Sequence, residues 1–113
     1  MPCIVYICCM NLEFNKNEDV SLLRQRLKQV SLGGGKKSIE KQKERKKLTA
    51  HERIDYLRDR DKPFTEIGAL AGWEMYEEQG GCPSGGTVAG LGYVSGHQCS
   101  IVANDQTVKA GAW

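Results

Sequence analysis

This sequence has no long hydrophobic run and almost no net charge. Its most apolar stretch, residues 1–9, is far too short to span a bilayer, and it lacks the basic start and small-residue cleavage site of a signal peptide. The formal net charge is +2, so the overall charge favours no class of partner. We therefore expect no association with a membrane, and any functional signal must lie in local patterns.

Cysteine is present, but not in a pattern that binds zinc. The count is odd, Cys8 and Cys9 are adjacent, and no zinc-ligand spacing occurs among Cys3, Cys8, Cys9, Cys82 and Cys99. We expect Cys99, inside a predicted strand, to be a small core residue. The simplest interpretation is a reducing, cytoplasmic environment.

The two histidines also lack partners for chemistry. Neither His51 nor His97 has another potential ligand at a metal-binding spacing. We therefore predict no metal site and assign neither histidine a catalytic role. We expect His51 to be a surface residue.

Helical patterns fill residues 17–62. Asn17 is expected to cap a first helix with Glu18 and Asp19 in its first turn, where the helix dipole favours acids. One apolar stripe at helical spacing runs along this helix, and we expect it to pack in a core: Val20, Leu23, Leu27 and Val30. Three glycines at residues 33–35 end the helix.

A second helix is predicted over residues 36–47, polar nearly all round and therefore at a surface. It carries seven basic residues against Glu40 and Glu44, namely Lys36, Lys37, Lys41, Lys43, Arg45, Lys46 and Lys47. Such a cluster can attract phosphate, nucleic acid or an acidic protein surface, but from charge alone a solvated helix face is the preferred interpretation. Thr49 and Glu52 then form the capping box of a third helix, with Ile54, Tyr56 and Leu57 on its apolar side.

The C-terminal half has strand patterns. Residues 64–67 are extended, residues 80–86 form a flexible glycine-rich connection, and strands at 87–94 and 97–103 flank a two-residue turn, Ser95-Gly96. Gly90 and Gly92 remove side chains from one strand face, which permits a backbone or a ligand to approach. The hairpin opens a sheet, but only a loop follows it, so we expect a truncated domain. Met10 is an alternative start, which would make residues 1–9 a non-native N-terminal extension.

In this order, the motifs resemble one family. They are Gly33-Gly34-Gly35-Lys36-Lys37, Lys47-Leu48-Thr49-Ala50, Glu52-Arg53-Ile54, Pro63-Phe64-Thr65-Glu66, Ser84-Gly85-Gly86, Gly92-Tyr93-Val94-Ser95-Gly96, Ile101-Val102-Ala103-Asn104-Asp105 and Thr107-Val108-Lys109-Ala110-Gly111. From about Leu12 onward the chain is similar to the N-terminal part of the carboxyltransferase (beta) subunit of biotin-dependent acyl-CoA carboxylases, of the propionyl-CoA and methylcrotonyl-CoA type. The resemblance implies an α/β chain: an N-terminal helical segment, residues 10–62, then the first β-hairpin of a crotonase-like domain of stacked β-β-α units, residues 63–113.

The resemblance also implies a function. The parent protein would transfer a carboxyl group from carboxybiotin, carried on a partner protein, to an acyl-CoA through an enolate stabilised by backbone N–H donors. Those donors lie later in the family's chain, so we expect this fragment to be inactive alone, with no catalytic residue and no cofactor of its own. Its implied partners are an acyl-CoA, other carboxyltransferase chains in a homo-oligomer, and the biotin carboxylase and biotin carrier subunits.

Two segments are candidates for the acyl-CoA side. The resemblance places a CoA-binding loop at Thr107, Val108, Lys109, Ala110 and Gly111, where Lys109 would pair with a phosphate or, alternatively, with a carboxylate. The basic stretch Arg45-Lys46-Lys47 is a second phosphate candidate, or else part of a subunit interface. Lys46 replaces a usual Gly of the family, and Gln106 a usual small residue.

Two other functions stay open. The chain could be a non-catalytic assembly module that docks on a full-length carboxyltransferase through the stripe from Val20 to Val30. Nucleic-acid binding by residues 36–47 is the weakest alternative, because no aromatic residue is interleaved with the lysines. We therefore predict no nucleic-acid partner.

Overall fold

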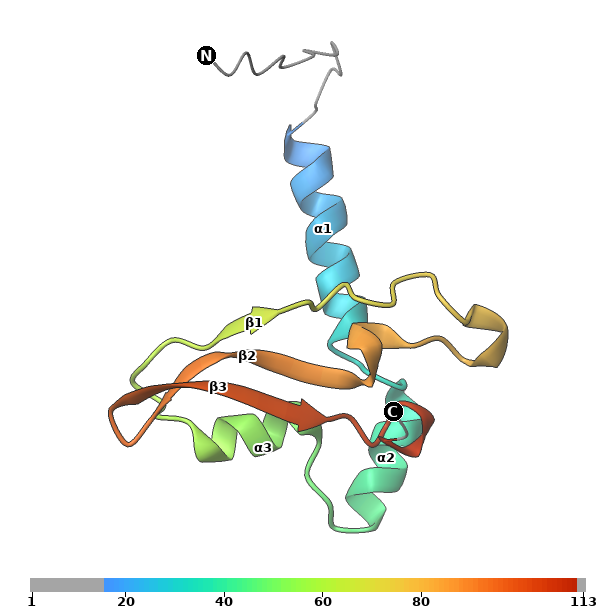
Figure 1. The fold of residues 1–113 in the computed structure, drawn as a ribbon. Helices are drawn as coiled ribbons and strands as arrows, with labels where there is room; N and C mark the ends of the chain where they lie inside the picture. Colours follow the sequence, from blue (N-terminus) through green and yellow to red (C-terminus); the bar gives the residue numbers. More distant parts are fainter. Residues whose placement is uncertain (1–15, 112–113) are drawn as a thin grey trace, which may run out of the picture.

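A computed structural model describes residues 16–111, and predictions for residues 1–15 and 112–113 lie outside the described residues. Three helices come first: α1 (Lys16–Val30), α2 (Lys36–Glu44) and α3 (Ala50–Leu57). Three strands follow: β1 (Thr65–Ile67), β2 (Thr87–Val94) and β3 (His97–Asn104). Short helical turns lie at Glu77–Gln79, Pro83–Gly86 and Lys109–Gly111. In Figure 1, α3 lies against the sheet while α1 stands away from it.

The strands form one antiparallel sheet in the order β1-β2-β3, with Glu66 opposite Gly90 and Val94 opposite His97. The predicted hairpin is confirmed. Ser95 and Gly96 both have positive φ, 51° and 80°, as a two-residue hairpin turn requires. Asp59 holds this turn, because its Oδ1 accepts the Ser95 N–H at 2.9 Å and its Oδ2 accepts the Gly96 N–H at 2.7 Å.

The core lies between α3 and the hairpin. Ala50 and Ile54 of α3 are buried against Val88 and Ile101 of the two strands, and partly buried neighbours surround them: Phe64, Val94, Cys99 and Ala103. The glycines of β2 leave space that neighbouring side chains of this core fill. A Cβ on Gly90 would lie 2.5 Å from the Phe64 ring and from the Thr65 carbonyl oxygen, so β1 and its preceding ring fill that space.

The apolar stripe of α1 is largely exposed, and the expectation that it packs in a core is wrong for three of its four members. Val20, Leu23 and Leu27 are 44%, 45% and 40% exposed, whereas Val30 is 4% exposed. The physical reason is that no described element runs beside the first turns of α1 (Figure 1). Asn17 lies within α1 and is not its cap, although Glu18 and Asp19 occupy the first turn as predicted.

The capping box of α3 is confirmed. Thr49 Oγ1 accepts the Glu52 N–H at 3.3 Å, and Glu52 Oε2 accepts the Thr49 N–H at 2.9 Å. The apolar side was predicted less well, since Tyr56 and Leu57 are 82% and 54% exposed. Ala50 and Ile54, four residues apart, occupy the face towards the sheet instead.

Helix α2 ends at Glu44, three residues before its predicted end. The Lys46 N–H bonds to the Lys43 carbonyl oxygen at 2.9 Å, and the Lys47 N–H bonds to the Gln42 carbonyl oxygen at 3.0 Å. This is the Schellman pattern that ends many helices, and it puts Lys46 in the left-handed region with φ 55°. The position where the family usually has Gly is therefore one whose backbone favours Gly.

The stretch before β2 is more ordered than the expected flexible connection. Ser84 and Gly86 are buried, and Ser84 Oγ donates to the Ala69 carbonyl oxygen at 3.0 Å. None of the described helices is both long enough and apolar enough to cross a bilayer.

Candidate functional site

The loop after β3 is fixed by one buried carboxylate. Asp105 is 7% exposed, and its Oδ1 accepts hydrogen bonds from Thr107 N at 2.9 Å and from Thr107 Oγ1 at 2.6 Å. The Thr107 hydroxyl oxygen in turn accepts the Gly34 N–H at 2.9 Å. The loop is thereby tied to the three-glycine turn between α1 and α2.

That turn tolerates no side chain at its centre. A Cβ on Gly34 would overlap the carbonyl oxygen of Thr107, because the two backbones are in close approach. On the neighbouring Gly33, a Cβ would lie 2.6 Å from Thr107 Oγ1. The glycine run therefore does more than end α1, since it lets the C-terminal loop dock against the helical segment.

The five candidate residues of this loop fall into two groups. Thr107 and Val108 are buried at 9% and 4% exposure, so their side chains support the loop. Lys109 and Ala110 are exposed and have positive φ, and Gly111 is half-buried. The Lys109 ammonium lies 4.6 Å from the centre of the Tyr76 ring, a cation–π contact in place of the carboxylate pair considered as an alternative.

The structure brings the loop together with the second candidate segment. A cleft of about 300 Å³, here called the basic cleft, is lined by Ser38, Lys41, Gln42, Arg45, Lys47, Gln106, Thr107 and Ala110. Its first wall is formed by residues 38, 41 and 42 on one face of α2 together with Arg45, which directly follows the helix, and its second wall is the loop after β3. Arg45 and Lys47 therefore share a cleft with Thr107 and Ala110, whereas Lys109 and Gly111 are outside its lining. Lys46, in the left-handed turn, is also outside it.

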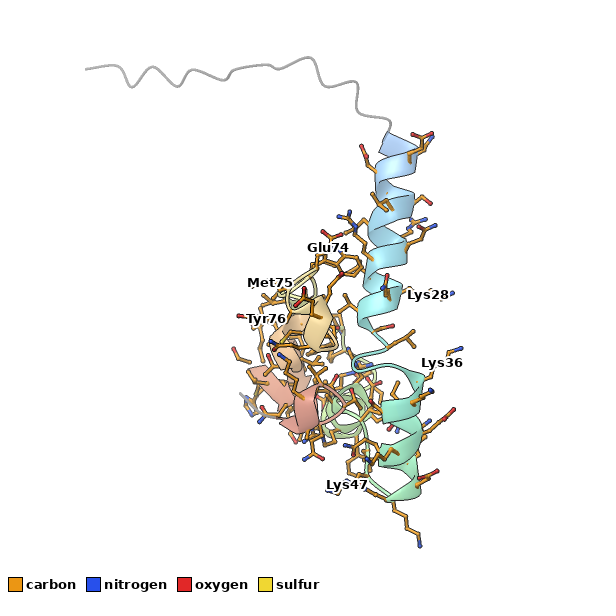
Figure 2. The ribbon with its side chains drawn as sticks, turned by 90° about the vertical axis from the view of Figure 1, so that its right-hand side faces the viewer. Lys28, Lys36, Lys47, Glu74, Met75 and Tyr76 are labelled. Carbon is orange, nitrogen blue, oxygen red and sulfur yellow. The ribbon has the colours of Figure 1, made fainter. Side chains whose placement is uncertain are left out.

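The charge of the basic cleft has one sign. Lys41, Arg45 and Lys47 line it, no carboxylate does, and none of the three is ion-paired within residues 16–111. Figure 2 shows Lys36 and Lys47 at opposite ends of α2, so only part of this basic helix faces the cleft. A site of this kind suits an anion.

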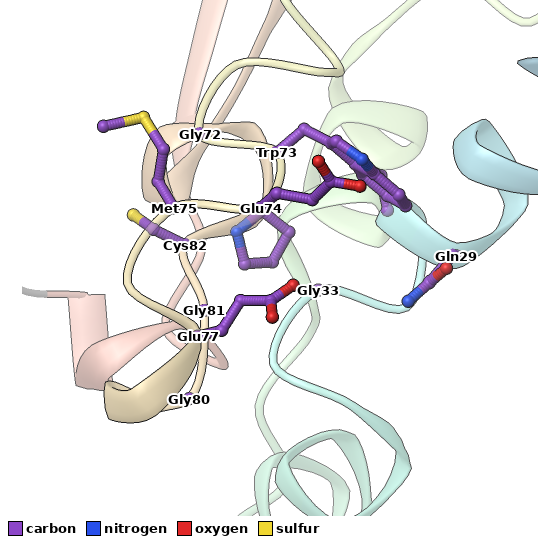
Figure 3. A pocket seen from close by; sticks show the side chains of 12 residues that line it. Gln29, Gly33, Gly72, Trp73, Glu74, Met75, Glu77, Gly80, Gly81 and Cys82 are labelled. Carbon is purple, nitrogen blue, oxygen red and sulfur yellow. The ribbon is translucent and has the colours of Figure 1, made fainter.

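A second pocket has acidic side chains in its lining instead of basic ones. This pocket, of about 180 Å³, is lined by Glu74 and Glu77 and by no lysine or arginine. Figure 3 shows the Glu74 side chain next to Trp73, Glu77 further down beside Gly81, and Gln29 of α1 across the pocket. The Trp73 indole Nε1 is buried without a hydrogen-bond partner among the described residues, and the Arg26 guanidinium lies 5.5 Å from the ring centre.

Two polar features were missed from the sequence. His51 is partly exposed, and the sequence did not reveal that its Nε2 lies 3.1 Å from Glu66 Oε2, a contact that links α3 to β1. Gln42 was not singled out, yet it is 9% exposed and lines the basic cleft. The spacing of residues 38, 41, 42 and 45, one face of a helix, was a readable signal for the second feature. The described residues include no group of three or more metal-ligating side chains.

Comparison with known proteins gives a consistent result. Residues 41–113 match the family described as the carboxyl transferase domain. The chain is 49% identical over 102 residues to a probable mitochondrial methylcrotonoyl-CoA carboxylase beta chain of Drosophila melanogaster, which covers 88% of this chain and 18% of that protein. It is 42% identical over 94 residues to a biotin-dependent 3-methylcrotonyl-coenzyme A carboxylase beta1 subunit of Mycobacterium tuberculosis, covering 83% and 17%.

Solved structures agree. A transcarboxylase 12S structure with methylmalonyl-coenzyme A bound has a TM-score of 0.77 at 29% identity, covering 89% of this chain and 20% of that one. The beta subunit of geranyl-CoA carboxylase from P. aeruginosa has a TM-score of 0.71 at 29% identity, covering 98% and 21%. The chain thus spans about a fifth of the length of these relatives. It belongs to the carboxyl transferase domain family and contains part of that family's crotonase-like fold.

Proposed function

We propose that this chain is the N-terminal part of an acyl-CoA carboxylase beta subunit and that it supplies part of the acyl-CoA site. The whole protein would move a carboxyl group from carboxybiotin to an acyl-CoA. One observation carries the site proposal: the loop after β3 meets the cations of α2 and of the turn that follows it in a single basic cleft. Support for the substrate class comes from the relatives, which are named as acyl-CoA carboxylases, and from the bound methylmalonyl-coenzyme A of transcarboxylase 12S.

Within this site the residues have different tasks. The buried side chains of Thr107 and Val108 support the loop. The exposed residues Lys109 and Ala110 would present a cation and a small side chain to the ligand. Arg45 and Lys47 supply positive charge from the other wall. These contacts concern parts of the substrate remote from the reacting carbon, so they would strengthen ground-state and transition-state binding alike.

The chemistry itself needs more than this chain. We assign no catalytic residue, no metal and no resident cofactor to it. The carboxybiotin would arrive on a biotin carrier subunit, charged by a biotin carboxylase subunit, and other beta chains would complete a homo-oligomer. The hexamer assembly described for transcarboxylase 12S is consistent with such an oligomer.

The test is to extend the chain to the length of its relatives and to assay it with the biotin subunits. The extended subunit is expected to carboxylate an acyl-CoA, and the 113-residue chain is expected to show no activity. Activity of the short chain alone, or no carboxylation of any acyl-CoA by the extended one, would contradict the proposal. Cytoplasmic location is part of the same proposal, and fractionation of the expressing cells tests it, since the Drosophila relative is named as mitochondrial.

A second function is favoured by the exposed stripe of α1. Val20, Leu23 and Leu27 offer an apolar surface through which the chain would dock on a full-length subunit without taking part in the chemistry. Co-purification of the short chain with a full-length subunit, lost when the three residues are changed to Ser, would support this assembly role. Activity of the extended chain with intact binding of its partners after the same change would favour the enzyme.

A further inference from the structure

A third cavity, here called the Asp105 cavity, lies where three separate parts of the chain meet. These are the turn after α1, the start of α3 and the loop after β3, and the enclosed volume is about 220 Å³. Its lining includes Ser31, Gly33, Thr49, His51, Asp105 and Thr107. No lysine or arginine of the described chain lines it, so its charge differs from that of the basic cleft.

The Asp105 carboxylate brings a negative charge without a counter-ion to this cavity. The residue is 7% exposed, and the two hydrogen bonds from Thr107 both go to Oδ1. The other oxygen, Oδ2, has no hydrogen-bond partner among residues 16–111, and no described lysine, arginine or histidine forms an ion pair with Asp105. Oδ2 is nevertheless not closed off from water. A charge that is more than nine-tenths buried is destabilising unless it is paired, so the carboxylate needs a cation.

The free oxygen lies against the glycine turn. A Cβ on Gly33 would overlap Asp105 Oδ2, so the oxygen occupies the space that a side chain at this position would fill. Gly33 and Asp105 both line the cavity. Because Gly33 has no side chain to cover it, Oδ2 is open to whatever occupies the cavity.

The ends of two helices contribute to the potential in the Asp105 cavity. Ser31 directly follows the last residue of α1, so the carbonyl end of a 15-residue helix, with its partial negative charge, is at the cavity. The start of α3 has the opposite polarity, but the Glu52 carboxylate lies in its first turn and accepts the Thr49 N–H. With Asp105 added, the net potential favours a positive charge.

The available oxygen atoms indicate which cation fits. Besides the carboxylate, the lining offers the hydroxyl oxygens of Ser31, Thr49 and Thr107. One carboxylate among neutral oxygens balances a single positive charge, whereas a Ca²⁺ ion is usually held by more acidic ligands in a larger coordination shell. Zinc and similar metals need groups of histidine, cysteine and carboxylate ligands, which the described residues do not contain.

We infer that the Asp105 cavity binds a small monovalent cation, an alkali metal or ammonium ion, in contact with Asp105 Oδ2. The ion neutralises the buried carboxylate and joins the turn after α1 to the start of α3 and to the loop after β3. It takes no part in carboxyl transfer, and the inference does not depend on the proposed function. Its effect is to order the loop after β3, whose docking on the glycine turn it reinforces.

Rubidium is the probe for this site, because it has the charge and the oxygen preference of potassium and gives an anomalous X-ray signal. Crystals of the extended subunit are prepared in tetraethylammonium chloride, whose cation is too bulky for close contact with the carboxylate, and are then soaked in rubidium chloride. An anomalous peak in contact with Asp105 Oδ2 is the expected result. Absence of this peak, or a lysine or arginine of the extended chain found in its place, would overturn the inference.

Hydrogen exchange of the Gly34 and Thr107 amides measures the effect in solution. At a rubidium concentration ten times its Kd, their protection is expected to be about tenfold higher than in tetraethylammonium chloride at equal concentration. The increase should saturate, as binding to one site requires. An equal response to both salts would be an effect of ionic strength and would contradict the inference.

Three variants locate the response. Asp105→Asn removes the charge and is expected to abolish both the anomalous peak and the gain in protection. Because this change can also loosen the loop, Ser31→Ala tests the site with the carboxylate intact, and it should weaken rubidium binding about threefold or more. Asp61→Asn, at an exposed position, is the matched control and should leave the response unaltered. A rubidium response that survives Asp105→Asn, or that Ser31→Ala and Asp61→Asn change equally, would refute the site.

Discussion

Thr107 Oγ1 and Asp105 Oδ1 lie 2.6 Å apart in the buried part of the loop after β3. The same hydroxyl oxygen accepts the Gly34 N–H, so one small side chain joins the loop to the turn between α1 and α2. Thr107→Val keeps the shape and removes both hydrogen bonds. We expect a loss of about 1.5–3 kcal/mol in the free energy of unfolding, because the partner is an ionised group. Denaturant unfolding of the extended subunit measures it.

Thr107→Ser is the control for this change. It keeps the hydroxyl group and should lose less than half as much stability. If Ser and Val were equally destabilising, the methyl group and not the hydrogen bonds would hold the loop.

Lys46→Gly is expected to stabilise the protein by about 1 kcal/mol. Lys46 has φ 55°, and a residue with a side chain in this region is strained by about 1–2 kcal/mol, part of which is offset by the greater freedom of Gly in the unfolded chain. The same substitution at Lys37, inside α2, should destabilise by about 1 kcal/mol. Opposite signs in thermal unfolding of the two variants are the expected result, and equal signs would contradict the Schellman ending of α2.

The Glu52 carboxylate gives α3 a pH dependence. Its hydrogen bond from the Thr49 backbone N–H, helped by Lys43 and the Thr49 hydroxyl, lowers the Glu52 pKa from its ordinary value of 4.5 despite partial desolvation. A group with a depressed folded-state pKa stabilises the fold above its ordinary pKa and loses that contribution as the pH falls through the folded-state value. The capping box should therefore weaken below pH 4.5.

Hydrogen exchange of the α3 amides, corrected for its intrinsic pH dependence, measures this effect. Protection should fall below pH 4.5 in the unaltered protein and change much less in Glu52→Gln. Glu40→Gln, on the exposed surface of α2, provides the same charge change as a control. A pH response unaltered by Glu52→Gln would remove this carboxylate from the effect.

Lys109 should act on substrate binding more than on turnover. In Lys109→Ala the KM for acyl-CoA is expected to rise about tenfold, in line with the loss of a charge-assisted contact of roughly 1.5–3 kcal/mol, while kcat changes less. The contact with Tyr76 is weaker, about 0.5–1 kcal/mol at an exposed site, so a phosphate can displace it. Lys109→Arg should retain most of the affinity. A collapsed kcat with an unchanged KM would place Lys109 in the chemistry or in the scaffold.

Elements with strong local signals were predictable from the sequence. The capping box at Thr49 and Glu52 begins α3, and the Ser95-Gly96 pair makes the hairpin turn. Each of these signals is contained within a few residues, so no knowledge of tertiary contacts is needed. The end of α2 was less predictable, because a Lys replaces the glycine that would have marked it.

Contacts between residues far apart in the sequence could not be predicted from local sequence patterns. Nothing around His51 indicates that Glu66 lies beside it, because the two residues are 15 positions apart and only the tertiary fold brings α3 next to β1. The face of α2 and the loop after β3 are separated by more than sixty residues, and their meeting depends on the contact of Gly34 with Thr107. The stripe of α1 was readable as apolar, but periodicity alone does not identify which surface covers it.

The close approach of Gly34 to Thr107 has a mechanical consequence. Helix α1 has 15 residues, which corresponds to a rigid rod about 22 Å long. The turn that follows this helix is joined to the loop after β3, because the Gly34 N–H donates to Thr107 Oγ1 and the two backbones are in close approach. The position of α1 and that of the loop after β3 are therefore linked through this glycine turn, and a partner that binds the exposed residues of α1 would contact a helix anchored to that loop.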